Sequence, residues 1–143
     1  MTKADLIDRN VFLKQLGFSS AALLAVGLAA CSKAADVAPL VSDIPLDLTD
    51  ASNAALKTNG GYLVLSSQNV VVARTLTGGY AAVTLICSHQ NQRQIYYTNG
   101  GFQCSAHGAR FDDTGKGLNA NGSNGLKSYA TSLSGNILTI KAS

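Results

Sequence analysis

The sequence is poor in charge. Charged residues make up only 13% of the 143 residues, the formal net charge is +3, and hydrophobic residues make up 46%. A disordered chain, or a nucleic-acid-binding protein with a basic face, would carry far more charge. We therefore expect one globular domain of ordinary size and no nucleic-acid partner.

Glutamate is missing altogether, so every acidic residue is an aspartate. The sequence shows no Ser-His-Asp set, and Asp112 and Asp113 are the only acids near the two histidines. The glycine-rich segment 114–125 lacks the Gly-Lys-Ser/Thr ending of a phosphate-binding loop. Without an acid–base pair, the chain is not expected to be an enzyme by itself.

A long hydrophobic run is also missing. The longest uncharged apolar run covers residues 18–30, too few to cross a hydrocarbon core of about 30 Å at about 1.5 Å per helical residue. Basic residues precede this run and small residues end it, which is typical of a signal peptide. An amphipathic or buried N-terminal helix, the alternative, would not explain its lack of charge. We therefore predict a lipoprotein-type signal peptide over residues 1–30.

The segment that follows predicts a lipid anchor. Leu28-Ala29-Ala30-Cys31 resembles a bacterial lipobox, which implies that Cys31 becomes an acylated N-terminus that holds the protein stably at a membrane. Residues 31–42 then form the lipidated cysteine and a flexible tether. This places the protein in the bacterial cell envelope, periplasmic or otherwise extracytoplasmic. Residues 9–17 are similar to a twin-arginine export signal, but Asn10 replaces the second arginine, so the export route stays open.

From about residue 43 the sequence changes to short β-rich runs. Runs of β-branched and aromatic residues are separated by Gly, Asn and Ser, and only residues 50–58 suggest a helical period. Asn99-Gly100-Gly101 and Ser134-Gly135-Asn136 are strong hairpin signals, and Pro45 suggests an edge strand. Seven or eight strands predict an all-β fold, a small antiparallel sandwich or barrel, over residues 43–143.

Two Cys/His pairs stand out against this background. Cys87-x-His89 and Cys104-x-x-His107 contain both histidines and two of the three cysteines of the chain. Each pair comes at the end of a predicted strand, so two loops could bring two thiolates and two imidazoles to one point. Such a set can hold a metal centre, and chance clustering of four rare residues is improbable.

Two metal centres fit these donors. A structural zinc ion would accept two Cys and two His, but zinc modules usually group Cys with Cys and His with His. In a Rieske [2Fe–2S] cluster, two Cys bind one iron and two His bind the other, which explains why each pair is mixed. The alternative to a redox protein is therefore a zinc-stabilised binding module.

The segment resembles the Rieske family. The family pattern is Cys-x-His, a spacer in the mid-teens, then Cys-x-x-His-Gly followed by an aromatic residue and Asp, and the likeness covers roughly residues 43–141. It implies a [2Fe–2S] cluster held between two loops at hairpin tips. Cys87 and Cys104 would bind one iron, and His89 and His107 the other.

The resemblance also implies a function. A Rieske protein of this kind is expected to carry single electrons at the outer face of a bacterial membrane, between a donor and an acceptor protein that the sequence does not identify. The alternative is the Rieske small subunit of a larger oxidoreductase.

Several positions depart from the respiratory-complex branch of that family. That branch adds one cysteine to each loop to form a disulfide, where this chain has Gln92 and Ala106. It also has Ser and Tyr hydroxyls that donate to cluster sulfurs, where this chain has Ala109 and Phe111. Losing donors destabilises the reduced cluster, so the resemblance implies a potential toward the lower end of about −150 to +300 mV. The third loop of the family usually contains proline, whereas residues 117–129 contain none.

Overall fold

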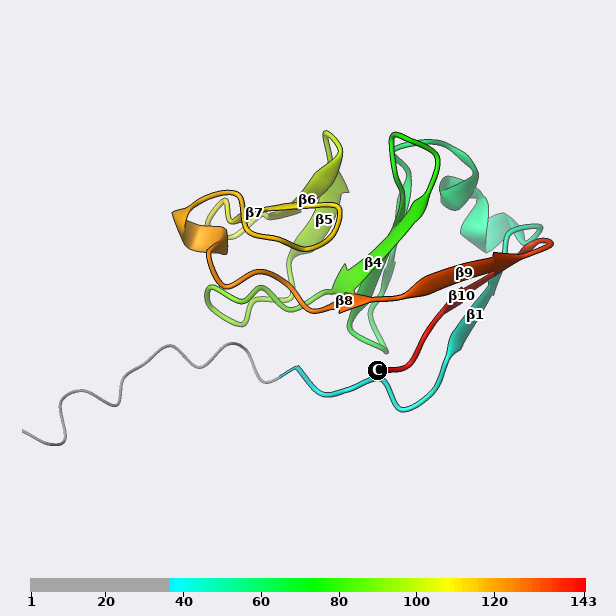
Figure 1. Cartoon of the computed structure of the whole chain (residues 1–143), viewed down its shortest axis with the longest axis horizontal. Helices are drawn as coiled ribbons and strands as arrows, with labels where there is room; N and C mark the ends of the chain where they lie inside the picture. The colour runs from blue at the N-terminus through cyan, green and yellow to red at the C-terminus, as the bar shows by residue number, and fades with distance from the viewer. Residues whose placement is uncertain (1–36) are drawn as a thin grey trace, which may run out of the picture. The chain divides into compact units, whose positions relative to one another are not determined.

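Ten β-strands and two short 3-10 helices make up residues 37–143, the part of the chain that the structure, a computed structural model, describes (Figure 1). The predicted signal peptide, Cys31 and the first part of the tether lie outside the described residues. Within residues 37–143, no helix is long and apolar enough to cross a membrane. The elements are β1 (Ile44–Asp47), η1 (Ala51–Lys57), β2 (Tyr62–Leu65), β3 (Val70–Arg74), β4 (Tyr80–Thr84), β5 (Ile95–Thr98), β6 (Gly101–Cys104), β7 (Arg110–Asp112), η2 (Ala120–Gly122), β8 (Ser128–Tyr129), β9 (Thr131–Ser134) and β10 (Ile137–Ile140).

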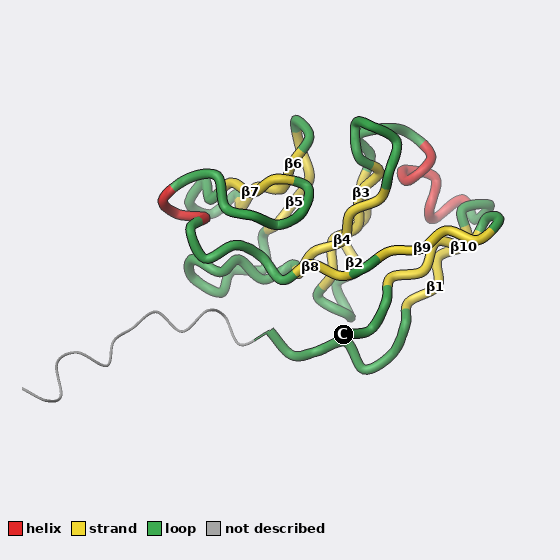
Figure 2. The backbone as a smooth tube through the Cα atoms, viewed as in Figure 1, coloured by secondary structure: helices red, strands yellow, loops and turns green. Residues whose placement is uncertain are grey.

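The strands form three sheets in which every pairing is antiparallel. The strand orders are β1-β10-β9, β2-β3-β4-β8 and β5-β6-β7. Figure 2 shows that loops, rather than helices, join most of these strands. The predicted antiparallel all-β fold is confirmed. The strands outnumber the seven or eight expected, partly because the run over residues 126–133 divides at Ala130 into β8 and β9, which belong to different sheets.

The central strand β3 is buried on both faces. Val70 and Val72 point into one core with Leu138 and Ile140 of the β1-β10-β9 sheet. Val71 and Ala73 point into a second core, which contains residues of the β5-β6-β7 sheet. Because successive strand residues face opposite sides, an uninterrupted apolar run such as Val70–Ala73 is what a strand between two cores requires.

The turn residues match the hairpin signals in the sequence. Asn99 and Gly100 both have positive φ, 50° and 81°, and join β5 to β6, as expected for a tight hairpin turn. Gly135, with φ of 56°, joins β9 to β10. Pro45 lies in β1, which is an edge strand of its sheet, where a residue without an N–H is tolerated.

Candidate metal centre

One thiol comes from a loop between two sheets and the other from a strand, and both lie in the core that includes residues of the β5-β6-β7 sheet. Cys87 lies in the connection from β4 to β5, and Cys104 is the last residue of β6. Both are buried and free of disulfides, and both belong to the core that contains Phe102 and Phe111. The two thiols are close enough for Cys104 to raise the pKa of Cys87. The fold therefore brings together two cysteines that are 17 positions apart in the sequence.

The surroundings of Cys87 set its acidity. Burial raises the pKa of the Cys87 thiol above its ordinary value, and the neighbouring Cys104 thiol raises it further. The backbone N–H groups of His89 and Gln90 point at the sulfur and act in the opposite direction, because they stabilise a thiolate. A cation placed at the two thiols would overcome the effect of burial, since metal ligation deprotonates a thiol.

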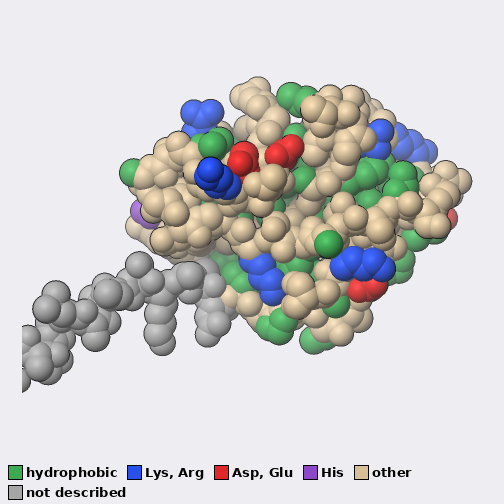
Figure 3. Space-filling model, viewed as in Figure 1, with side chains coloured by type: hydrophobic (Ala, Val, Ile, Leu, Met, Phe, Trp, Pro, Cys, Tyr) green, Lys and Arg blue, Asp and Glu red, His purple; other side chains and the backbone are tan. Residues whose placement is uncertain are grey.

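The two imidazoles also lie together, but at the surface. The ring centroids of His89 and His107 are 5.3 Å apart, and the ring planes are inclined by 68°. Both residues are exposed, and Figure 3 shows imidazole atoms at the molecular surface. The sequence-predicted set is thus arranged as a buried thiol pair and an exposed imidazole pair.

The two Cys/His loops close with the same backbone pattern. In the first loop, residues 87–92, the N–H of Cys87 donates to the carbonyl of Gln92, and the N–H of Asn91 donates back to Cys87. In the second loop, residues 104–109, the N–H of Cys104 donates to the carbonyl of Ala109, and the N–H of Gly108 donates to the carbonyl of Cys104. The first loop connects two sheets, whereas the second closes the β6–β7 hairpin.

The two loops are also joined to each other. The N–H of Ser105 donates to the carbonyl of Gln94 at 3.1 Å, and the Ser105 hydroxyl donates to the Gln94 side-chain oxygen at 2.8 Å. Gln94 lies two residues beyond the first loop, so these bonds connect the segment that follows the first loop to the start of the second. Gln92 and Ala106, which stand where the respiratory branch has its disulfide, are exposed and partly buried, respectively, and Ala106 packs against the core.

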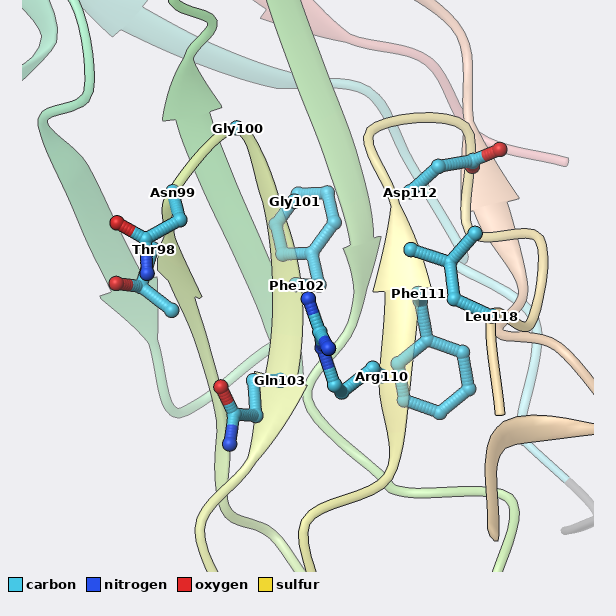
Figure 4. Close-up of a pocket in the computed structure, with 10 residues that line it drawn as sticks. All are labelled: Thr98, Asn99, Gly100, Gly101, Phe102, Gln103, Arg110, Phe111, Asp112 and Leu118. Carbon is cyan, nitrogen blue, oxygen red and sulfur yellow. The ribbon is translucent and has the colours of Figure 1, made fainter. Parts of the chain in front are cut away.

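A pocket at the β5-β6-β7 sheet contains none of the four Cys/His residues. It has a volume of about 400 Å³ and is lined by residues of β5, β6 and β7 together with Leu118. Figure 4 shows Arg110 reaching from β7 toward β6, opposite its register partner Gln103. Phe102 and Phe111 line the pocket and also belong to the core that contains both cysteines, so the pocket adjoins that core but offers none of the four candidate ligands.

Within residues 37–143, no three or more His, Cys or Asp side chains gather around a single point. The four candidate residues form two pairs instead. A single tetrahedral zinc ion needs all four donors around one point, whereas each iron of a Rieske cluster takes only two protein ligands. The donor set and its pairing therefore fit a binuclear cluster.

Comparison with known families decides between these centres. The family model of the Rieske [2Fe-2S] domain matches residues 49–130. The chain belongs to the Rieske family. Rieske domains bind a [2Fe-2S] cluster and transfer electrons, so this domain does the same, in exchange with redox partner proteins.

Solved structures agree with this assignment. The cyanobacterial plasma membrane Rieske protein of Synechocystis PCC 6803 is 34% identical, with a TM-score of 0.52, over 62% of this chain and 93% of that one. A quaternary ammonium Rieske monooxygenase (14% identity, TM-score 0.51, 62% and 28% covered) and naphthalene 1,2-dioxygenase (20%, 0.50, 61% and 24%) share the fold. The Rieske domain thus spans about a quarter of the length of those two oxygenases. No match was found among curated protein sequences.

One further buried group fits a cluster at this site. The hydroxyl of Ser88, between Cys87 and His89, is buried and has no hydrogen-bond partner within residues 37–143. Buried hydroxyls almost always have a partner, so an acceptor at the site would resolve this exception. The sequence analysis missed Ser88, although its place inside the Cys-x-His motif was visible. It also missed Asn91, whose φ of 52° is the same kind of left-handed conformation as that of Gly108, at 67°.

Proposed function

We propose that Cys87 and Cys104 bind one iron of the [2Fe–2S] cluster and that His89 and His107 bind the other. The observation that supports this most strongly is the arrangement in two pairs: the thiols are buried in one core, and the imidazoles are exposed with ring centroids 5.3 Å apart. The cluster, when bound, supplies one-electron oxidation and reduction.

The thiols and the imidazoles have different roles at the proposed site. The buried thiols hold the inner side of the site away from water, and the N–H groups of His89 and Gln90 stabilise negative charge on Cys87. The exposed imidazoles keep a ring edge open to solvent.

Metal analysis of the full chain tests the ligands. We expect two irons and two inorganic sulfides per chain, a red-brown colour, and a low-temperature EPR signal after reduction. Cys104→Ser should lose all three, because one iron loses a ligand. The matched control is Cys31→Ser, which removes the third cysteine and should keep the full cluster. A colourless protein that contains zinc would contradict the proposal.

We further propose that the mature protein is anchored through an acylated Cys31 and works at the outer face of a bacterial membrane. The lipobox-like sequence before Cys31 supports this. Incorporation of a labelled fatty acid and membrane fractionation test the anchor. Cys31→Ser should lose the label and leave the membrane fraction, whereas Cys104→Ser should keep both. Label that persists in Cys31→Ser would refute the anchor.

We also propose that the protein is an independent carrier. The similarity to the Rieske protein of Synechocystis, which covers 93% of the solved chain, supports this proposal, because nearly all of that chain corresponds to this one domain. Purification from native membranes tests this proposal. An independent carrier should dissociate from its redox partners when the salt concentration is raised. A subunit of a larger oxidoreductase should instead remain bound to the other subunits, and that result would contradict the proposal.

A further inference from the structure

The loop that follows β7 binds the second Cys/His loop through two asparagine side chains. In this loop, residues 117–126, the side-chain amide of Asn121 donates to the carbonyl of His107 at 2.8 Å. The side-chain amide of Asn119 donates to the carbonyl of Gly108, also at 2.8 Å. We call residues 117–126 the third loop.

Asn119 connects three segments at once. While its amide nitrogen donates to Gly108, its amide oxygen accepts from the backbone N–H of Arg110 and of Gly122, both at 3.0 Å. The bond to Gly122 closes the turn η2, and the bond to Arg110 attaches that turn to the start of β7. One side chain therefore fixes the third loop to the position where the second Cys/His loop ends.

The bonds form a continuous series along the second loop. The carbonyls of His107 and Gly108 accept from Asn121 and Asn119, that of Ala109 accepts from Cys104, and that of Arg110 accepts from the N–H of Leu118. Four successive carbonyls are thus held, three of them by the third loop. A segment bound at each successive residue has little freedom to rotate.

The third loop lies too close to β7 to admit a side chain at its centre. A Cβ added to Gly122 would come within 2.4 Å of the carbonyl oxygen of Arg110 and 3.2 Å of the Phe111 ring. Gly122 is buried. The absence of a side chain there allows the backbone approach that brings both asparagines within reach of the second loop.

We propose that Asn119 and Asn121 are positioning residues that fix the second Cys/His loop and thereby orient the imidazole of His107. In this chain, Gln92 and Ala106 provide no disulfide between the two Cys/His loops, and the asparagine amides hold the second of these loops through the third loop instead. This inference rests on the proposed role of His107 as a ligand.

Asparagine-to-aspartate variants separate the two functions of these side chains. Asn119→Asp keeps the oxygen that accepts from Arg110 and Gly122, but it replaces the donor to Gly108 with a second acceptor. Asn121→Asp replaces the donor to the carbonyl of His107 with a second acceptor. Asn124→Asp is the matched control, because it adds the same charge to an exposed position of the third loop that makes no side-chain hydrogen bond within residues 37–143.

Three measurements on the full chain test the proposal. Asn119→Asp and Asn121→Asp should each release iron to a chelator about fivefold faster than Asn124→Asp, as expected for the loss of one hydrogen bond. The EPR signal of the reduced protein should broaden in both variants, because His107 samples more orientations. Hydrogen exchange at the Gly108 amide should also be faster, and Asn124→Asp should match the wild type.

Several outcomes would overturn the proposal. Iron release, EPR width and Gly108 exchange that match Asn124→Asp would show that the amides do not position the loop. Faster iron release with an unchanged EPR signal would indicate a general loss of stability instead. If the purified wild type contains no iron or sulfide, the proposed function fails, and exchange at Gly108 in the protein as purified still decides whether the asparagines hold the loop.

Discussion

Two residues that are not among the four candidate ligands decide how the Cys/His loops close. Asn91 and Gly108 occupy the same place, four residues after each cysteine, and both have a left-handed backbone with φ of 52° and 67°. Only glycine, and to a lesser degree Asn or Asp, adopts this conformation readily. The glycine of the Cys-x-x-His-Gly motif therefore allows the left-handed backbone conformation that closes the second loop. Asn91 adopts the same conformation in the first loop, where the motif has no glycine.

Gly108→Ala tests this conformational role without a steric clash. No atom lies within 4 Å of a Cβ added at this position, so the cost comes from the backbone alone, about 1–2 kcal/mol of unfolding free energy. Gly108→Asn should recover part of that loss. Urea unfolding of the three proteins measures both effects. An alanine variant as stable as the wild type would show that the loop has another accessible conformation.

The buried hydroxyl of Ser88 gives a prediction on the redox potential. If this hydroxyl donates to the bound cluster, Ser88→Ala should lower the reduction potential, because a donor stabilises the more negative reduced form. A redox titration followed by EPR measures the shift. If the potential is unchanged and Ser88→Ala is more stable than the wild type, the hydroxyl has no partner and only costs free energy through its burial.

Ala109 lies where the respiratory branch of the family has a hydroxyl. It is fully buried, next to the second loop, and offers no donor. We therefore expect the wild-type potential near the lower end of about −150 to +300 mV, and we expect Ala109→Ser to raise it. Ala130→Ser, at an exposed position between β8 and β9, is the control and should leave the potential unchanged. A wild-type value near the top of the range would contradict the first expectation.

At the scale of the elements, β3 divides the interior into two cores, and only one of them contains the candidate metal ligands. One core lies against the β1-β10-β9 sheet and contains Leu138. The other contains both cysteines and the edge-to-face pair of Tyr97 and Phe102, whose ring centroids are 5.1 Å apart. A change in the first core should alter stability alone, whereas a change in the second should also reach the metal centre.

Leu138→Ala and Phe102→Leu test this division. Leu138 is fully buried, so its truncation should cost about 2–5 kcal/mol of unfolding free energy and leave the EPR signal unchanged. Phe102→Leu should cost less stability but shift the EPR signal or the potential, since Phe102 precedes Cys104 by two positions on the same face of β6. An altered EPR signal in Leu138→Ala would show that the two cores are coupled.

The sequence predicted those parts of the structure that depend on local pattern or on rare residues. The four Cys/His residues were visible because the chain has so few of either type, and the apolar run of β3 and the Asn99-Gly100 turn carry strong local signals. The pairing of Asn119 and Asn121 with carbonyls 11 and 14 positions away has no such signal. In a sequence, such an asparagine indicates only a loop or turn. Its amide can form a hydrogen bond with any nearby backbone group, so the sequence does not specify the partner.

Sheet membership was also beyond the sequence pattern. Alternation of apolar and polar residues identifies a strand and its buried face, but it does not specify the neighbouring strand. A single residue, Ala130, separates β8 from β9, yet β8 pairs with β4 and β9 pairs with β10. That division depends on contacts with strands that are distant in the sequence. The residues of the run 126–133 do not by themselves indicate these contacts.

At the scale of the whole domain, hydrogen-bonded aspartates make the free energy of unfolding depend on pH. Hydrogen bonds from Thr114, first from its hydroxyl, and from the N–H of Lys116 lower the pKa of Asp112. Asp43, Asp47 and Asp50 are lowered by similar bonds to neighbouring groups. A group with a lowered folded-state pKa stabilises the protein above its unfolded value, here 3.8, and loses that contribution as the pH falls through the folded pKa.

We therefore expect the unfolding free energy to fall below about pH 4, and Asp112→Asn to reduce the dependence. The amide oxygen of the variant still accepts from Thr114 and Lys116, so the fold should be retained. The stability difference between wild type and variant, measured by urea unfolding at pH 6 and pH 3, should shrink at the lower pH. A difference that is equal at both values would mean that Asp112 does not contribute through its charge.

The two ends of the domain lie beside each other. Ile44 of β1 is paired with Ile140 of β10, and just beyond them Asp43 accepts from the N–H of Ala142 at 2.8 Å and from Lys141 at 3.0 Å. Chain segments attached to either end therefore start from neighbouring points. A unit built this way can be spliced into a surface loop of a larger polypeptide without separating the strands on either side of the junction. The same geometry makes it a practical insertion cassette for engineered redox chains.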